Sequence, residues 1–265
     1  MFKYNVNVRM PGILTICLLV FISLPSQATQ ILVSGNSMND SNPQFTQAIA
    51  GLGLQATFVA PSSFSNTRLD DFDIVWLDGF SQFGNGPWSS NLMTFMNGGG
   101  NVFVQNPGFG SESMSTYPLG DSLAADFTYP PGQNTIRILE TSNPVNLGLD
   151  STGLSLWNSA SGYGYFTSIT GFTGLTDTGT AGQWVTLMTP VGAGYLVYTQ
   201  QGVSQYLSDI SNPGSKSQAA RFLYNVSTLG STSVPVPPTL GLFLVGVMFV
   251  GWMTAHKSGI ARQHI

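Results

Sequence analysis

The sequence predicts an α/β domain with a mainly parallel sheet, helices on both faces and a more antiparallel C-terminal half. In the first half, short apolar runs alternate with longer segments of helical spacing, and turn residues separate the two kinds of segment. A strand, a helix and a further strand at this spacing require a crossover connection, so the two strands should be parallel. Beyond residue 110 this regularity weakens, and antiparallel pairing is expected there.

The first strand–helix–strand unit is clear. Residues 31–33 (ILV) form a short apolar run that ends in the turn sequence SGNS, which predicts a strand. Residues 42–52 (NPQFTQAIAGL) have apolar residues at helical spacing, and Asn42 is suited to cap this helix with a proline in its first turn. Residues 55–59 (QATFV) predict the second strand.

The second unit contains the strongest strand signal. Residues 73–77 (DIVWL) are rich in β-branched and aromatic side chains, which predicts a central strand buried on both faces. A helix is predicted at 88–97 (WSSNLMTFMN) because its apolar residues lie along one helical face, and the glycine triplet 98–100 should end it. Residues 102–104 (VFV) predict the next strand.

The second half of the domain is predicted element by element. A helix at 215–229 (SKSQAARFLYNVSTL) closes the domain. Strands are expected at 135–139 (TIRIL), 154–157 (LSLW), 184–188 (WVTLM) and 195–199 (YLVYT).

This order of elements resembles the class I glutamine amidotransferase-like superfamily. The stretches that carry the resemblance are DFDIVWLDGF, GGGNVFVQNPGFG and GAGYLVYTQQGV. The resemblance implies a flavodoxin-like parallel sheet over most of the domain. It also implies, in active members, a cysteine nucleophile on the turn after the strand that matches residues 102–104, with a histidine later in the chain. Here that turn reads QNPGFG from Gln105 to Gly110, so it offers no such nucleophile.

Cysteine and histidine are missing from the whole predicted domain. The one cysteine is Cys17 and the two histidines are His256 and His264, so residues 29–233 contain neither type. Ser-His-Asp and Cys-His mechanisms are therefore excluded for the domain, as are metal sites made of thiolates or imidazoles. We expect a non-catalytic domain without catalytic residues, cofactor or metal.

Polar residues at the predicted strand ends form a candidate ligand crevice, because open α/β sheets bind ligands at the carboxyl ends of their strands. Most such residues in proteins are turn formers and core aromatics. The alternative function is a carboxylate-dependent carbohydrate-active enzyme, in which Asp78 works with Asp40 or Glu112. The crevice candidates are Asn36, Asn39, Asp40, Asp78, Asn106 and Phe109, with Trp76, Phe80 and Trp88 as further stacking surfaces.

The charge distribution argues against nucleic acid as a partner. Within residues 29–233 four basic residues stand against all twelve acidic ones, a net charge of −8. A surface of this sign repels phosphate backbones. The four basic residues are Arg68, Arg137, Lys216 and Arg221.

The N-terminus has the pattern of a secretory signal peptide. Lys3 and Arg9 precede the apolar run 13–24 (ILTICLLVFISL), and the small residues of PSQA follow. We expect cleavage after Ala28; an uncleaved anchor is the alternative, but about twelve apolar residues are short for a bilayer.

The C-terminus carries a second apolar run. Residues 240–255 (LGLFLVGVMFVGWMTA) contain no charge, and Lys257 and Arg262 follow them. The positive-inside rule places these two basic residues on the cytoplasmic side of the membrane. A single membrane helix is therefore predicted. The predicted division is a signal peptide at 1–28, the α/β domain at 29–229, a linker at 230–239, the membrane helix at 240–255 and a short basic tail at 256–265.

The linker resembles the PEP-CTERM sorting signal, in which a Val-Pro-Glu-Pro-Ser/Thr motif precedes an apolar helix and a basic end. The matching residues are Val234, Pro235, Pro237, Pro238 and Thr239, while Val236 replaces the glutamate of the motif. The resemblance implies processing by an exosortase in a Gram-negative bacterium. The protein would be anchored in the inner membrane first, then released to the cell surface or exopolysaccharide matrix, with polysaccharide as a candidate ligand. The alternative is a plain membrane anchor with a stiff proline-rich spacer.

Overall fold

The computed structural model describes residues 28–35, 42–78, 88–106, 117–126, 135–155, 164–208 and 213–230, all within the compact unit Ala28–Ser231. Within these segments no helix has both the length and the apolar character needed to cross a bilayer. The predicted signal segment before Ala28, the sorting motif and the helix at 240–255 lie outside the described residues. These three features stay predictions.

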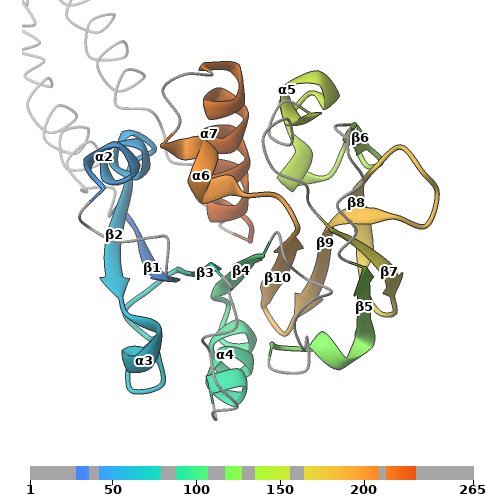
Figure 1. The fold of residues 1–265 in the computed structure, drawn as a ribbon. Helices are drawn as coiled ribbons and strands as arrows, with labels where there is room; N and C mark the ends of the chain where they lie inside the picture. The colour runs from blue at the N-terminus through green and yellow to red at the C-terminus, as the bar shows by residue number, and fades with distance from the viewer. Residues whose placement is uncertain are drawn as a thin grey trace, which may run out of the picture. The chain divides into compact units, whose positions relative to one another are not determined.

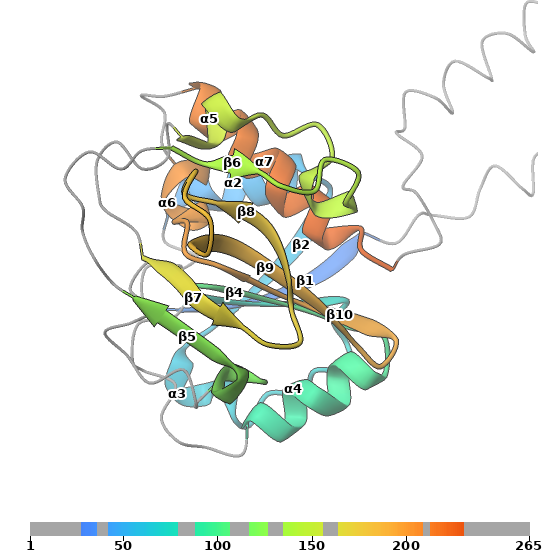
Figure 2. The same cartoon turned by 90° about the vertical axis from the view of Figure 1, so that its right-hand side faces the viewer.

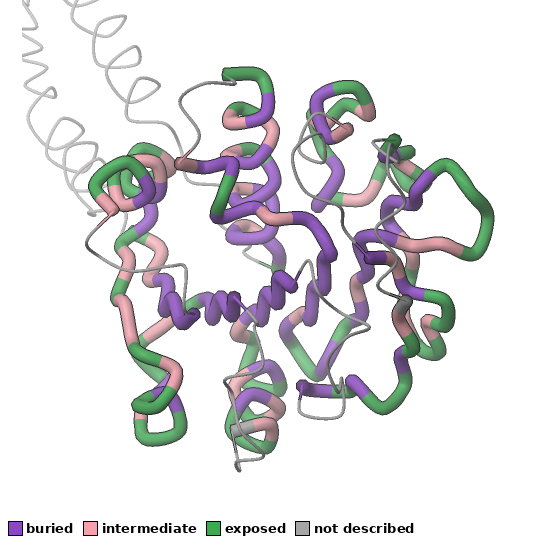
Figure 3. Tube along the Cα trace, in the orientation of Figure 1, coloured by how far each residue is buried: buried purple, intermediate pink, exposed green. Residues whose placement is uncertain are grey.

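The first half of the sheet is parallel (Figure 1). β1 (Thr29–Gly35) lies between β2 (Leu54–Val59) and β3 (Ile74–Asp78), and β4 (Asn101–Gln105) lies between β3 and β10 (Gly194–Thr199). Each neighbouring pair in this series is parallel. Every residue of β3 and β4 is buried (Figure 3), as the apolar runs predict for strands covered on both faces.

The other half of the sheet is antiparallel. β9 (Trp184–Val191) pairs antiparallel with β10, with β8 (Thr173–Asp177) and with β7 (Tyr165–Ile169). β7 also pairs with β5 (Leu123–Asp126), and β8 with the short β6 (Arg137–Ile138). The expectation of a more antiparallel C-terminal half is confirmed.

Four helices cover one face of the sheet (Figure 2): α2 (Pro43–Gly51), α5 (Ser151–Ser155), α6 (Val203–Leu207) and α7 (Pro213–Ser227). Their apolar side chains form one core with the side chains that β1, β3 and β4 direct to this face. α2 begins where the sequence predicts, because Oδ1 of Asn42 accepts hydrogen bonds from the first free N–H groups of the helix at 3.1 Å.

The opposite face carries α3 (Pro61–Phe64) and α4 (Trp88–Asn97) (Figure 2). Leu92 and Met96 of α4 are fully buried in a second core cluster. The predicted helix stop is confirmed: Gly99 has a φ of 104°, and the glycines around it donate hydrogen bonds to the last carbonyls of α4.

One predicted strand is wrong. Residues 154 and 155 of the predicted strand 154–157 belong to the helix α5. The carboxylate of Asp150 accepts a hydrogen bond from the N–H of Gly153 at 2.6 Å, and its carbonyl accepts one from the N–H of Leu154. This local capping of a helix start outweighs the alternating apolar pattern of LSLW. Two short 3-10 helices, η2 (Gly120–Ser122) and η3 (Pro144–Asn146), complete the described elements.

Candidate functional site

The carboxyl ends of the parallel strands meet at one edge of the sheet. Gly35 at the end of β1 is in register with Asp78 at the end of β3, and Asp78 is in register with Gln105 at the end of β4. Gln105 is paired in turn with Thr199 of β10. Asp78 and Asn106, two of the predicted crevice residues, therefore lie at the strand ends where the sequence places them.

Asp78 is part of a network of buried side chains. The Nε2 of Gln105 donates a hydrogen bond to Oδ1 of Asp78 at 3.0 Å, and Oγ of Ser204 donates to Oδ2 at 3.4 Å. Gln105 also joins Ser204 directly: its Nε2 donates to Oγ at 2.6 Å, and its Oε1 accepts from the backbone N–H at 3.0 Å. We call these three residues the Asp78–Gln105–Ser204 cluster.

The cluster joins β3, β4 and α6 and is closed to solvent. Asp78 and Gln105 are each 2% exposed, and Ser204 is 7% exposed. The amide of Gln105 uses both its donor and its acceptor within the cluster, so its orientation is fixed. Because Ser204 lies in the first turn of α6, the network fastens this short helix to the sheet edge.

Sequence patterns missed two of the three cluster residues. Gln105 had a usable signal, because it is the polar residue that ends the apolar run VFV and stands in register with Asp78. Ser204 had none, since it lies in a helix of five residues and is 99 residues away from Gln105 in sequence.

Gly35 is required by the close approach of β1 and β3. A Cβ at this position would lie 2.8 Å from the carbonyl oxygen of Asp78 and would overlap the Cβ of Asp78. A side chain at residue 35 would therefore displace Asp78 from the cluster. The sequence predicted only a turn here, whereas the structure gives this glycine a packing role as well.

Asn106 and its neighbours continue the buried polar edge. Asn106 is 0% exposed, and its N–H donates to the carbonyl of Thr199 at 3.0 Å. The hydroxyl of Thr199 shares a hydrogen bond with that of Thr186 at 3.0 Å and accepts one from the N–H of Gln201 at 3.2 Å. This part of the edge is thus a packed layer of polar groups.

Trp76 corrects one sequence expectation. As a candidate for ligand stacking it should be accessible, but it is 0% exposed. Its ring centroid lies 5.6 Å from that of Phe45 and 5.3 Å from that of Phe103. Trp76 and Asp78 point to the same face of β3 because they are two residues apart, and α2 covers this face at Trp76 through Phe45.

The other crevice candidates are not placed by the structure. The side chain of Trp88 and the residues Asn36, Asn39, Asp40, Phe80, Phe109 and Glu112 lie outside the part that is described. The pairing of Asp78 with Asp40 or Glu112 stays a prediction for the same reason.

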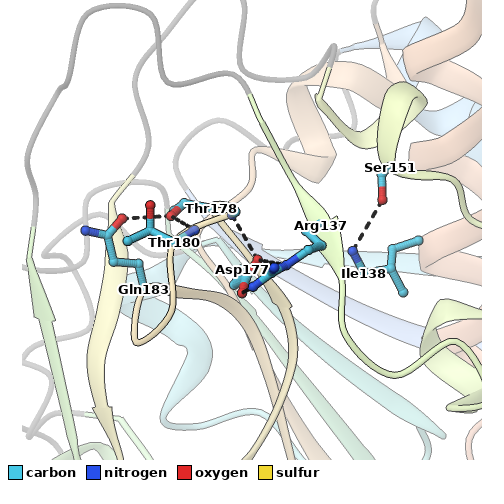
Figure 4. A network of polar contacts seen from close by, with 8 residues as sticks. Arg137, Ile138, Ser151, Asp177, Thr178, Thr180 and Gln183 are labelled. Atoms are coloured by element: carbon cyan, nitrogen blue, oxygen red, sulfur yellow. Dashed lines mark hydrogen bonds and ion pairs between the residues drawn. The ribbon is translucent and has the colours of Figure 1, made fainter.

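A second polar network joins β6 to β8 (Figure 4). Arg137 donates from Nε to Oδ1 of Asp177 at 3.1 Å and from Nη2 to Oδ2 at 2.5 Å. The Asp177 side chain is 3% exposed and that of Arg137 is 52% exposed. The hydrogen bond to Asp177, and then its charge, raise the pKa of the Arg137 guanidinium. Asp177 also accepts from the N–H of Gly179 at 2.9 Å, so the network fixes the turn after β8.

Two of the acidic residues before β3 have partners among the described residues. Oδ2 of Asp73 accepts a hydrogen bond from the N–H of Gln30 at 2.8 Å, and Asp70 forms an exposed ion pair with Arg68 at 2.9 Å. Among the described residues, no group of three or more His, Cys, Asp or Glu side chains is arranged to hold a metal ion.

No protein family model matches this chain, and no curated protein sequence matches it either. Solved structures do match its fold. PurLQS from Thermotoga maritima is 11% identical, with a TM-score of 0.51 over 75% of this chain and 97% of that chain. A glutamine amidotransferase from Thermotoga maritima is 6% identical, with a TM-score of 0.45 over 78% and 99% of the two chains. The β-galactosidase from Rahnella sp. R3 is 13% identical, with a TM-score of 0.45 over 76% and 31%.

Of these three likenesses, the one to PurLQS has a TM-score above 0.5 and bears on the fold. Its identity of 11% is too low to carry over an activity. The domain has a mixed α/β fold, with a parallel and an antiparallel half in one sheet, and this fold is similar to that of PurLQS.

Proposed function

We propose that this chain is a non-catalytic, exported protein of the cell surface or exopolysaccharide matrix, sorted through a PEP-CTERM-like C-terminal signal. The order of its parts carries the proposal. A signal-peptide pattern ends at Ala28, and the motif at residues 234–239 stands directly before the apolar run 240–255 and Lys257. An exosortase-type enzyme is the processing partner, and the membrane is engaged through the C-terminal helix.

The chemistry at the end of β4 supports a non-catalytic role. The resemblance places the family nucleophile on the turn after residues 102–104, where this chain has Gln105 and Asn106. The amide of Gln105 is committed to Asp78 and Ser204, and no histidine exists between residues 29 and 233 to activate a hydroxyl. The polar groups of this edge hold the fold together instead of facing a substrate.

The alternative of a carboxylate-dependent enzyme has less support. A catalytic carboxylate must reach its substrate, and inverting or retaining glycosidases need two that face one another. Asp78 is 2% exposed and accepts hydrogen bonds on both oxygens. The domain's work is therefore proposed to be binding, to polysaccharide or to another surface protein.

Mass spectrometry of the mature protein from its native host tests the sorting proposal. We expect an N-terminus at Thr29 and a C-terminus within residues 234–239. The double variant Pro235→Ala/Pro237→Ala should retain the tail, whereas Ser231→Ala in the linker, outside the motif, should be processed like the wild type. A mature chain that still contains Trp252 would show a plain anchor and refute the sorting role.

A further inference from the structure

A groove lies between α4 and the connection from α3 to β3, on the sheet face opposite to α6. Its volume is about 650 Å³, which is within the range of small-ligand sites. It is separate from the crevice expected at the strand ends, because its walls belong to the face that α3 and α4 cover. We call it the α3–α4 groove; the residues that matter here are Asn66, Arg68, Phe72, Asn91, Phe95 and Gly100.

Two phenyl rings give the groove an apolar wall. Phe72 and Phe95 are half-buried and pack against the core, so only part of each ring is accessible. Phe95 packs closely against the backbone of Gly100, since a Cβ on Gly100 would overlap its ring. A fixed, flat apolar surface of this kind suits the C–H face of a sugar ring.

Uncharged polar groups surround these rings. Asn66 and Asn91 are exposed, and their side-chain amides make no hydrogen bond to another described residue. Each amide offers two donor hydrogens and an acceptor oxygen, which matches neighbouring hydroxyls that both donate and accept. The hydroxyl of Thr94 donates to the carbonyl of Ser90 at 3.0 Å and can still accept from a ligand.

The charges of the groove cancel. Arg68 and Asp70 form an ion pair with Nη2 and Oδ2 2.9 Å apart, and both side chains are about three-quarters exposed. Residues 29–233 as a whole carry a net charge of −8, so an anionic ligand would be repelled on approach. A neutral ligand with hydroxyl groups and an apolar ring face therefore fits the groove best.

We infer that the α3–α4 groove binds a neutral saccharide. The inference rests on the proposed function in one respect, namely that the exported domain meets polysaccharide. It goes beyond that function in two ways: it places the binding site on the α3–α4 face, away from the strand ends, and it states that the ligand is uncharged.

Affinity electrophoresis of the full-length protein tests this inference. The native gels contain a sugar-free detergent and one polysaccharide each: dextran, mannan, galactomannan or xylan as neutral probes, and alginate as the acidic comparison. At least one neutral probe should retard the wild type, and alginate should not. The double variant Asn66→Ala/Asn91→Ala should bind about tenfold more weakly, because it loses two hydrogen-bonding amides. Thr94→Arg should abolish retardation by filling the groove.

Asn97→Ala is the matched control, because Asn97 is an exposed asparagine of the same helix outside the groove. Retardation that persists in Asn97→Ala but is lost in the groove variants supports the inference. No retardation by any neutral probe, stronger retardation by alginate, or unchanged binding by the double variant overturns it. The sorting role is tested separately, by the mature C-terminus. A protein that keeps its anchor but binds sugar refutes the sorting role alone. A processed protein that binds no sugar refutes saccharide binding in the groove alone.

Discussion

Gln105 donates a hydrogen bond from Nε2 to Oδ1 of Asp78 at 3.0 Å, although the two residues are 27 positions apart and end different strands. Both are 2% exposed, so the bond forms away from water, where a group that loses its partner is costly. The end of β4 thus carries an amide that fastens α6 to the sheet.

Gln105→Ala should therefore lower stability strongly. The change removes one hydrogen-bond partner of the Asp78 carboxylate and the acceptor of the backbone N–H of Ser204, and both groups stay buried. We expect the free energy of unfolding to fall by about 2 to 4 kcal/mol. Urea unfolding followed by tryptophan fluorescence measures it. Gln44→Ala, on the exposed side of α2, should change stability by less than about 0.5 kcal/mol. Equal effects of the two changes would contradict the role of the cluster.

Gly35→Ala should destabilise the same edge by a different route. The new Cβ would overlap Asp78, so β1 and β3 must move apart, at a cost of about 1 to 3 kcal/mol. Gly51→Ala in α2 is the control, because no atom lies within 4 Å of the added Cβ. Alanine suits a helix better than glycine, so Gly51→Ala should raise the free energy of unfolding by about 0.5 to 1 kcal/mol. Thermal unfolding of both variants measures these changes in stability. If Gly35→Ala leaves the stability unchanged, the ends of β1 and β3 are loosely packed and the prediction is wrong.

Arg137→Ala should lower the urea midpoint far more than Arg68→Ala. Both arginines pair with an aspartate, but the Asp177 side chain is 3% exposed and that of Asp70 is 73% exposed. Removing Arg137 leaves a buried carboxylate with fewer partners, whereas removing Arg68 leaves a solvated one. Arg137→Lys should recover only part of the loss, because lysine cannot donate to both oxygens in the same planar geometry. Similar urea midpoints for Arg137→Ala and Arg68→Ala would show that the buried ion pair contributes no more to stability than the exposed one.

The sequence predicted the elements that carry their own local signals. Asn42 marks the start of α2, and the glycine triplet marks the end of α4, whose bounds at 88–97 are confirmed. The strands β5, β7 and β8 were missed, because short segments such as TGLTD are rich in Gly, Thr and Asp and have little strand propensity of their own. These segments form strands because they pair with neighbouring strands: β7 and β8 pair with β9, and β5 pairs with β7.

The site shows the same limit. Asp78 was predicted at a strand end because a strong apolar run precedes it, and parallel register then fixes its edge. Its burial was not predictable, since it depends on Ser204 and α6, which are over 100 residues away. The α3–α4 groove was not predictable either. The loop before β3 and the helix α4 form it, and they come together only when the chain folds.

Tyr198 of β10 should give the protein a stability loss at alkaline pH. Burial raises its pKa well above the usual 10.0, with a smaller contribution from Tyr117, and its hydroxyl donates to the carbonyl of Pro118 at 2.6 Å. The folded state therefore keeps a proton that the unfolded chain releases above about pH 10. The stability that this proton contributes is complete below that pH and is lost as the pH rises.

Tyr198→Phe isolates this contribution. At pH 8 the variant should be less stable by about 1 kcal/mol, because the Pro118 carbonyl loses its donor. Above about pH 10 the wild type should lose stability more steeply than the variant, since phenylalanine has no proton to release, and the two curves should converge. Urea unfolding at several pH values, with phenolate absorbance as a second readout, measures the slopes. A fully buried phenol in an apolar cluster should ionise less readily than the same group in the unfolded chain. If the stabilities of the wild type and the variant fall in parallel as the pH rises, Tyr198 ionises equally readily in both states and the prediction is wrong.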